Sequence, residues 1–356
     1  MLVRQKLVVP ERDGVNFEVW PEAIELGRMF AAEGYELALV GGPVRDLLLH
    51  RKSHDLDFCT SARPEQFEHI LRRFGRDGFW DMGRKFGTLG AMRRREDGTE
   101  VQVEVTTYRS DTYDPDSRKP EVNYGDTLEG VLSRRDFTVN AMALDENGMV
   151  IDRYGGQMDL FRNVIRCVGD PDRRFAEDAL RMLRAVRFAA QLGFSIEKGT
   201  LDAIRRSARR AEKLSGERIK AELEKILLSP RPELAGELLR LGLLAHLGGR
   251  PDCPGLLALR EEPPEPVPRW RAFCRLTGFP IAALPVERAL RRGVLHPEAE
   301  AVRTLALSGG ELAALGLEGP AIGAAQRRLA AHILSHPEDN TPARLLALAR
   351  AELSGP

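Results

Sequence analysis

The 356-residue sequence has few cysteines and no long apolar run. Its four cysteines, Cys59, Cys167, Cys253 and Cys274, lie far apart and form no CxxC pair. This spacing argues against a disulfide framework or a zinc site and suits a reducing compartment. No stretch approaches the roughly 18 consecutive apolar residues of a membrane helix. Charges interrupt the N-terminal apolar residues, so we expect no signal peptide and a cytoplasmic protein.

Lysine is also scarce, because only 8 of the 53 basic residues are lysines. Arginine suits bidentate phosphate contacts, although a GC-rich genome produces the same bias. The net charge of zero conceals an uneven distribution: residues 1–160 carry 22 basic and 29 acidic side chains, and residues 161–228 carry 16 and 10. A basic segment behind an acidic domain suits a polyanionic partner and divalent cations. Solvated faces of arginine-rich helices explain the same pattern equally well.

What is present is an ordinary globular composition, with 43% hydrophobic and 30% charged residues, which excludes disorder, collagen and coiled coil. The hydrophobic pattern alternates between helix and strand up to about residue 165 and is mostly helical afterwards. We expect helices over 20–35 and 44–50 and from Pro64 onward, and strands over 36–40, 55–58, 86–95 and 100–109.

Two segments rich in turn-forming residues divide the chain. Residues 110–126 contain Asp, Pro, Ser, Asn and Gly and predict a mobile loop, and residues 250–268, rich in Pro and Glu, predict a linker. At about 150 residues per domain the length suggests two or three domains. We place them at residues 1–160, 161–249 and 250–356.

The first candidate site follows the strand over 36–40. Gly41 and Gly42 there allow backbone N–H groups to approach a phosphate closely, and Arg45 can clamp the same group. Two glycines after a strand are a weak signal, because many turns have them. Asp55 and Asp57 are more informative, since residues i and i+2 of a strand point to the same face.

Two carboxylates that close repel unless a cation lies between them. A pair of Mg²⁺ ions would relieve the repulsion and align a phosphoryl displacement, whereas an exposed edge strand with solvated acids explains the same pattern. Glu104, between Val103 and Val105, faces away from both and is a candidate third carboxylate. Gln102 shares its face, so a merely polar surface is equally consistent.

Two further segments combine arginine with acidic residues. In RRDFTVNA (134–141), Arg135 suits a triphosphate, Asp136 can hold a guanidinium, and Asn140 would share a helix face with Asp136. A helix N-terminus with Asp136 as its cap is the simpler explanation.

In EDALRMLRAVRF (177–188), one acid and three bases recur every three residues, which is typical of a surface ladder of ion pairs. Alternatively Asp178 and Arg181 present a carboxylate and a guanidinium to the edges of cytosine or adenine. The other two bases of this stripe are Arg184 and Arg187.

Taken together, the order GGPVRD, HDLDF, a loop, RRDFTVNA and GDPDRRFAEDALRMLRAVRFA resembles the class II tRNA nucleotidyltransferase/poly(A) polymerase family. The motifs cover residues 36–190. The resemblance implies an α+β fold: a polymerase-β-like nucleotidyltransferase head with a mixed or antiparallel sheet, followed by an all-helical neck, body and tail. Residues 1–160 would be the catalytic head, 161–249 would recognise the nucleobase and contact RNA, and 250–356 would hold tRNA.

Transferred motif by motif, the resemblance assigns roles to the candidate residues. Asp55 and Asp57 would be catalytic ligands of two Mg²⁺ ions, with Glu104 the least secure catalytic residue. The nucleotide-binding residues would be Gly41, Gly42, Arg45, Arg135, Asp136, Asn140, Asp178, Arg181, Arg184 and Arg187, of which Asp178 and Arg181 would read the base. In the loop over 110–126, Arg118 would reach Asp178 and retune the pocket.

The implied activity is addition of CMP, CMP and AMP to the 3′ end of tRNA from CTP and ATP, with no membrane partner. The loop over 110–126 favours CCA addition over CC addition. An A-adding enzyme and a poly(A) polymerase remain alternatives, and a non-catalytic RNA-binding protein is a remote one. The seven histidines offer no HD metal site, so we infer no phosphohydrolase activity.

Overall fold

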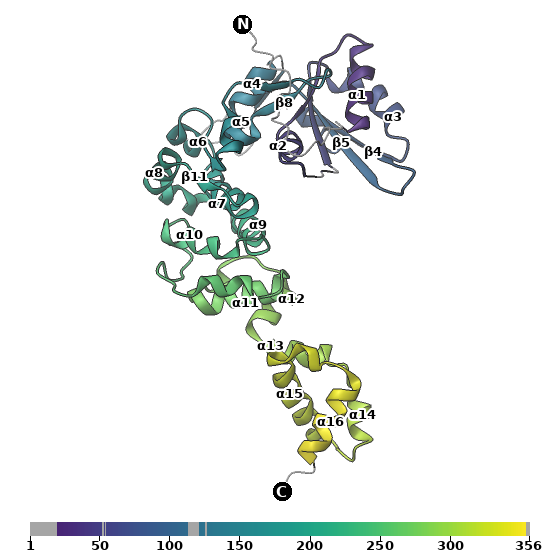
Figure 1. Cartoon of the computed structure of the whole chain (residues 1–356), viewed down its shortest axis with the longest axis vertical. Coiled ribbons are helices and arrows are strands. Elements are labelled where there is room, and N and C mark those ends of the chain that lie inside the picture. Colours follow the sequence, from purple (N-terminus) through teal and green to yellow (C-terminus); the bar gives the residue numbers. More distant parts are fainter. Residues whose placement is uncertain (1–19, 52, 54, 113–120, 125–126, 354–356) are drawn as a thin grey trace. The chain divides into compact units, whose positions relative to one another are not determined.

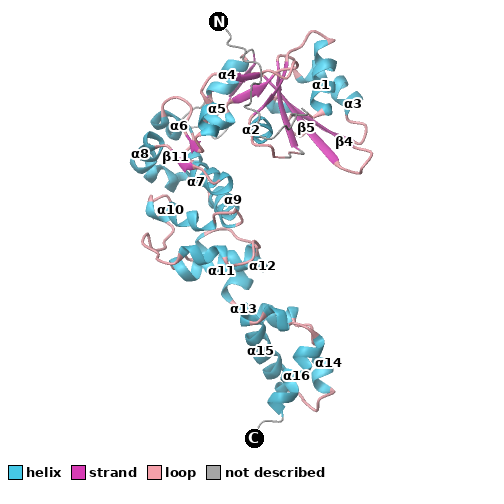
Figure 2. Cartoon of the chain, in the orientation of Figure 1, coloured by secondary structure: helices cyan, strands magenta, loops and turns pink. Residues whose placement is uncertain are grey.

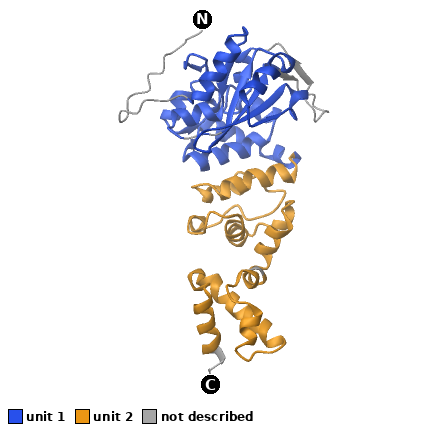
Figure 3. Ribbon diagram, turned by 90° about the vertical axis from the view of Figure 1, so that its right-hand side faces the viewer, with its two compact units in different colours: residues 1–213 blue, residues 214–356 orange. Residues whose placement is uncertain are grey.

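The computed structural model describes residues 20–51, 53, 55–112, 121–124 and 127–353 (Figure 1). Strands are confined to the N-terminal part, and the remainder of the described chain is helical (Figure 2). The chain divides into two compact units, residues 1–213 and 214–356 (Figure 3). No helix among the described residues is both long and apolar enough to cross a membrane.

A seven-stranded mixed sheet forms the centre of the first unit, in the order β3-β4-β5-β2-β1-β8-β9. The pair β2–β5 is parallel, and the other neighbours in this sheet are antiparallel. This is the α+β arrangement with a mixed sheet that the motifs implied. The strands are β1 (Leu37–Val40), β2 (Asp55–Thr60), β3 (Gly78–Trp80), β4 (Thr88–Arg94), β5 (Glu100–Thr107), β8 (Met142–Leu144) and β9 (Val150–Asp152).

Helices α1 (Pro21–Ala31) and α3 (Pro64–Phe74) pack together, and they contact β1 and β4 respectively. Phe30 of α1 and Phe67 of α3 are fully buried, with their ring centroids 5.7 Å apart. In β2 the apolar residues Leu56 and Phe58 are buried, whereas the acidic residues between them are exposed. The period of two in this strand therefore separates an apolar face from a face that carries carboxylates.

The sequence after Thr107 forms a hairpin where a loop was predicted. Strands β6 (Arg109–Thr112) and β7 (Glu121–Tyr124) pair antiparallel, with Thr112 opposite Glu121. The prediction of a loop is therefore wrong for these two strands, because cross-strand hydrogen bonds outweigh the turn-forming composition. Residues 113–120 and 125–126, including Arg118, lie outside the described residues.

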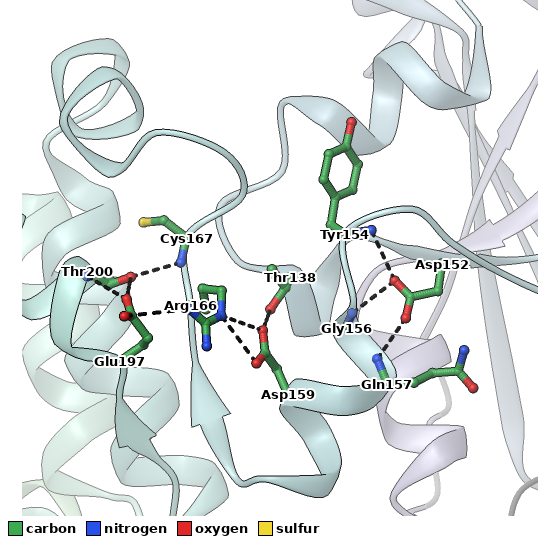
Figure 4. A network of polar contacts seen from close by, with 10 residues as sticks. All are labelled: Thr138, Asp152, Tyr154, Gly156, Gln157, Asp159, Arg166, Cys167, Glu197 and Thr200. Carbon is green, nitrogen blue, oxygen red and sulfur yellow. Dashed lines mark hydrogen bonds and ion pairs between the residues drawn. The ribbon is translucent and has the colours of Figure 1, made fainter.

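A polar network joins segments before and after the last two strands of the sheet (Figure 4). Arg166 bonds through Nε to the buried carboxylate of Asp159 at 3.1 Å and pairs with Glu197 at 3.5 Å. Thr138 donates to the same Asp159 at 2.7 Å. The network thus links η2 (Thr138–Asn140) and α5 (Gly156–Phe161) to the start of α8 (Lys198–Ser207).

Helices complete the first unit, apart from a short parallel pair between β10 (Val164–Ile165) and β11 (Ser195–Ile196). The helical pattern after residue 170 is broken at Asp178, which is the C-cap of one helix and lies just before the next. The remaining elements are α2 (Gly42–Leu48), η1 (Arg84–Phe86), α4 (Leu128–Ser133), α6 (Pro171–Glu177), α7 (Leu180–Leu192) and η3 (Ala208–Lys213).

In the second unit the segment predicted as a linker, 250–268, is packed. Leu259 within it is fully buried, and Arg260 pairs with Glu233 at 2.6 Å. Proline and glutamate dominate its composition and conceal the leucines that anchor it. The second unit contains α9 (Gly216–Leu227), η4 (Pro232–Leu234), α10 (Ala235–Arg240), η5 (Leu256–Arg260), α11 (Pro266–Thr277), η6 (Ile281–Ala283), α12 (Arg288–Leu295), α13 (Pro297–Thr304), α14 (Gly309–Ala313), α15 (Pro320–Ser335), η7 (Pro337–Asp339) and α16 (Pro342–Leu353).

Candidate active site

Carboxylates from two neighbouring strands lie on the open face of the sheet. Asp57 of β2 is in register with Glu104 of β5, and Asp55 with Gln102. All four side chains are exposed, while the residues between them are buried. The alternation of each strand therefore places Asp55, Asp57 and Glu104 on one face, as the sequence pattern indicates.

The protein surroundings raise the pKa of Asp57 above its usual value. Partial removal from water is the main cause, and the negative charges of Glu104 and Asp55 add to it, while Arg135 acts in the opposite direction. Within the described part of the chain, no three acidic, histidine or cysteine side chains converge closely enough to form a complete metal site. Asp55 and Asp57 thus form a carboxylate pair whose charge Arg135 offsets in part, and Glu104 does not complete a three-ligand set with them.

An open cavity of about 340 Å³ lies against this face. Its acidic side is formed by Asp57 and Glu104, and its basic side includes Arg109, Arg135 and Arg181. The cavity therefore presents both signs of charge, which suits a metal ion together with a phosphate group. Sequence reasoning missed Arg109, because it belongs to the segment we expected to be a strand end next to a loop.

The turn after β1 brings backbone and arginine into close contact. Gly41 has φ +77°, and a Cβ atom there would lie 2.8 Å from Nη1 of Arg135. Only glycine combines that backbone conformation with so close an approach. Arg45, in α2, lies beside Gly42, so that two guanidinium groups flank the glycine pair.

A chain of hydrogen bonds connects three distant segments beside this turn. Arg45 Nη1 donates to Asn140 Oδ1 at 2.8 Å, and Asn140 Nδ2 donates to Asp136 Oδ1 at 3.2 Å. Asp136 Oδ2 in turn accepts from Arg184 Nε at 2.7 Å. Asp136 and Asn140 do not share an α-helix face as predicted, because Thr138–Asn140 is a single 3₁₀ turn. They nevertheless interact directly, and Phe137 N donates to Asp136 Oδ1 instead of a helical cap bond.

The surroundings of Asp136 favour the ionised form of its carboxyl group. Burial alone would raise the pKa of Asp136, but the Arg184 guanidinium and the hydrogen bonds from Arg184 and Asn140 outweigh it and lower the pKa. Asp136 and Asn140 are both almost completely buried. Their contribution is therefore to hold Arg45 and Arg184 in place from behind.

The described contacts of the charged residues over 178–187 run mainly to groups outside this stripe. The carboxylate of Asp178 accepts from Leu180 N at 3.0 Å and so caps α7. Arg181 pairs with Glu177 at 2.7 Å and donates to the carbonyl oxygen of Arg134 at 3.0 Å. Arg187 donates to Gln191 at 2.9 Å. Asp178 and Arg181 lie at the start of α7, and Arg181 lines the cavity.

Two residues beside the cavity were missed by the sequence analysis. Glu177 holds both Arg181 and the buried Arg174, whose Nη2 lies 2.8 Å from it. Nε of Arg174 is buried with no hydrogen-bond partner among the described residues, and desolvation lowers the pKa of this guanidinium. The spacing of Glu177 four residues before Arg181 is the signal that would have found this pair.

Comparison with known proteins places these features in a family context. Residues 37–166 match the family described as "Poly A polymerase head domain", and residues 193–250 match "Probable RNA and SrmB- binding site of polymerase A". The CCA-adding enzyme of Geobacillus thermodenitrificans is 41% identical over 275 residues, which cover 72% of this chain and 63% of that protein. The chain therefore spans less than two thirds of the length of this curated relative.

Solved structures extend the similarity beyond the head. The Bacillus stearothermophilus CCA-adding enzyme in complex with CTP is 30% identical with a TM-score of 0.67, covering 93% of this chain and 81% of that one. A tRNA nucleotidyltransferase complexed with a primer tRNA and an incoming ATP analog is also 30% identical, with a TM-score of 0.50 and coverage of 60% and 59%. With the mixed sheet, the order of the motifs and these similarities in agreement, the chain belongs to the class II tRNA nucleotidyltransferase/poly(A) polymerase family, the family of the CCA-adding enzymes.

Proposed function

We propose that this protein is a CCA-adding tRNA nucleotidyltransferase, which transfers CMP, CMP and AMP from CTP and ATP to the 3′ end of tRNA without a nucleic-acid template. The observation that carries the proposal is the placement of Asp55 and Asp57 on an open sheet face beside a cavity with Arg135 and Arg181 in its wall. Similarity over 93% of the chain to an enzyme in complex with CTP supports the choice of substrate.

The carboxylate pair fits Mg²⁺. Asp55 and Asp57 provide the oxygen ligands that hard divalent cations prefer. The pKa of Asp57 is raised mainly by desolvation and further by the charges of Glu104 and Asp55, which a cation would offset. When bound, Mg²⁺ ions, of which we expect two, activate an attacking hydroxyl and neutralise charge on the phosphate being transferred. Glu104, in register with Asp57, adds negative charge on the same face of the sheet.

The arginines and the glycine turn would bind the incoming nucleotide. Because Gly41 and Gly42 have no side chains, the guanidinium groups of Arg135 and Arg45 lie close against this turn. There they would neutralise a phosphate group. Asn140 is almost completely buried and is bonded to Arg45 and Asp136. To bond a ribose hydroxyl, the role we assign to it from the motif, it would have to exchange one of these partners. Arg184 and Arg187 support these groups from α7. Holding the triphosphate still and compensating its charge are the main catalytic contributions of these residues.

Asp178 and Arg181 are the residues we assign to the base. An Asp–Arg pair can satisfy the donor and acceptor edges of cytosine and adenine and rejects guanine and uracil. Arg181 is bonded to Glu177 and to the Arg134 carbonyl oxygen, so reading a base requires it to exchange one of these partners. The Asp178–Arg181 pair, which would select the base in place of a nucleic-acid template, must therefore rearrange when the nucleotide enters.

The remaining assignments follow from the same proposal. The head would be residues 1–160, with residues 161–249 contacting the base and the RNA and residues 250–356 holding the tRNA. The protein would act in the cytoplasm, where its substrates ATP, CTP and tRNA are found.

The decisive experiment offers three primers to the purified protein with Mg²⁺, ATP and CTP: a tRNA lacking its 3′ end, a tRNA ending in CC, and oligo(A). We expect the first to gain CCA and the second to gain A, with little extension of oligo(A). Extension of only the CC primer would identify an A-adding enzyme, and long tails on oligo(A) a poly(A) polymerase. No incorporation with any primer would favour a non-catalytic RNA-binding protein.

The matched variants are Asp55→Ala and Asp57→Ala. Each should abolish transfer, by at least about 10³-fold, as expected when the ligands of catalytic metal ions are removed, while tRNA binding measured by filter retention stays close to that of the wild type. Removal of divalent ions with EDTA should act in the same way on the wild type and be reversed by added Mg²⁺. Near-normal turnover in either variant would contradict the metal assignment.

A further inference from the structure

Phe188, which the proposed function does not use, lies under three arginines of the candidate site. It belongs to α7 and is 6% exposed. The Cζ atoms of Arg45, Arg184 and Arg187 lie 5.4, 5.3 and 4.0 Å from the centre of its ring. All three distances are within the roughly 6 Å over which a guanidinium is attracted to the face of an aromatic ring.

The three guanidinium groups come from two separate segments and carry the same charge. Like charges held around one point repel, so the cluster needs compensation in the absence of a ligand. Arg184 has the buried Asp136 and Arg45 has Asp46, at 2.8 Å, as ionic partners, and Arg187 donates to the side-chain amide of Gln191. The electron-rich ring is a further, permanent source of compensation common to all three.

The ring is itself held in place. Phe137 packs edge-to-face against it, with the ring centroids 5.7 Å apart and the planes at 80°. Phe137 is fully buried and lies between Asp136, which holds Arg184, and the turn that carries Asn140. Arg45 and Arg184 are therefore fixed on one side by the chain Arg45–Asn140–Asp136–Arg184 and on the other by the ring of Phe188.

We propose that Phe188 is a positioning residue, which holds Arg45, Arg184 and Arg187 as one array that receives the phosphate groups of the incoming nucleoside triphosphate. This inference rests on the proposed function, because the ligand of the array is the triphosphate of that reaction. The ring compensates the positive charge of the three arginines only in part. An anion that binds to the array supplies the remaining compensation. The side chain of Phe188 itself need not touch the nucleotide.

The test replaces Phe188 by phenylalanines carrying one, two and three ring fluorines, which withdraw electrons from the ring face with little change in its size. Binding of CTP, and of cytidine as a ligand without phosphates, is measured by calorimetry in the absence of primer. We expect CTP affinity to fall stepwise with each fluorine, to roughly threefold to thirtyfold below that of the wild type. Cytidine affinity should not change. In steady-state assays KM for CTP should rise while kcat stays within about twofold of its original value.

Two conventional variants accompany the series. Phe188→Leu removes the ring and should behave like the most fluorinated protein, whereas Phe188→Tyr keeps the ring face and should bind CTP normally. Phe175→Leu is the control: Phe175 is fully buried in α6, and no described arginine is stacked on its ring. It should lower the melting temperature without changing CTP affinity.

CTP affinity that is independent of fluorination in a wild type that binds CTP would overturn the role of Phe188 and leave the proposed function intact. Equal losses of CTP and cytidine affinity would show that the ring only maintains the fold, and would also overturn it. A wild-type protein that binds no CTP at all would instead contradict the proposed function, and with it this inference.

Discussion

At the scale of a single residue, the buried carboxylate of Asp136 holds several neighbouring groups in place. It accepts hydrogen bonds from Arg184, Asn140 and the backbone N–H of Phe137, and it is 7% exposed. A buried carboxylate is stable only when its lone pairs are satisfied and its charge is paired. The ion pair with Arg184 fulfils both conditions and ties the 134–141 motif to α7.

Replacing Asp136 by Asn should therefore destabilise the protein by about 2 kcal/mol, since it leaves Arg184 without its counter-ion but keeps much of the hydrogen bonding. The lowered pKa of Asp136 adds a pH dependence. Its stabilisation is present above the unfolded-state pKa of about 3.9 and is lost as the pH falls through the lower folded-state value. Urea unfolding should show a difference between wild type and Asp136→Asn that is constant near neutrality and shrinks as the pH falls below about 3.9. A difference that grows on acidification would contradict the ion pair.

Arg181 is the residue at which base selection can be tested. Its side chain lines the cavity and is bonded to Glu177. Arg181→Ala should raise misincorporation of UTP and GTP relative to CTP by about tenfold or more, the discrimination usual for a bidentate contact to a base, with a smaller effect on triphosphate affinity. Glu177→Gln, which weakens the hold on Arg181, should have a milder effect of the same kind. If Arg181→Ala excludes UTP and GTP as well as the wild type does, Arg181 does not select the base.

At the scale of an element, the β6–β7 hairpin defines where the segment 113–120 can be removed. Thr112 and Glu121 are paired, so a two-residue Asn-Gly turn can join them without changing the register of the strands. We expect this replacement to leave CC addition largely intact and to stop addition of the terminal A. Product length on a tRNA without CCA is compared for wild type and replacement. Loss of both steps would indicate a structural role of the segment, and full CCA addition would show that it is dispensable.

At the scale of the whole molecule, the candidate site residues and the C-terminal helices belong to different compact units. Every described candidate residue lies in the first unit, residues 1–213, whereas the second unit has a hydrophobic core of its own around residues 301–349. In a protein that binds tRNA through two regions, removing one of the regions mainly lowers the affinity for tRNA.

A fragment comprising residues 1–213 should therefore retain CTP affinity to within about threefold, while its KM for tRNA rises by about tenfold or more. Calorimetry with CTP and steady-state kinetics with tRNA test the two parts, and thermal unfolding establishes that the fragment is folded. A folded fragment with an unchanged KM for tRNA would contradict the role assigned to the C-terminal helices.

The local chemistry of the site was determined by the sequence alone. The period of two in β2 places Asp55 and Asp57 on one face, because side chains alternate along any strand. That Glu104 of β5 shares this face follows from the pairing of β5 with β2. Gly41 was likewise recognisable as a turn residue. The order of the motifs was sufficient to identify the family and, through it, the α+β fold with its mixed sheet.

The tertiary structure decided which of these residues meet. Arg45 and Asn140 are 95 positions apart, and Asp136 and Arg184 are 48 positions apart, yet each pair is bonded directly. The break of the helix at Asp178, the β6–β7 hairpin and the burial of Leu259 were equally invisible to composition and periodicity. Periodicity reports the direction of a side chain relative to its own backbone. Contacts between distant segments depend on strand order and helix packing, which are settled only when the whole chain buries its apolar surface.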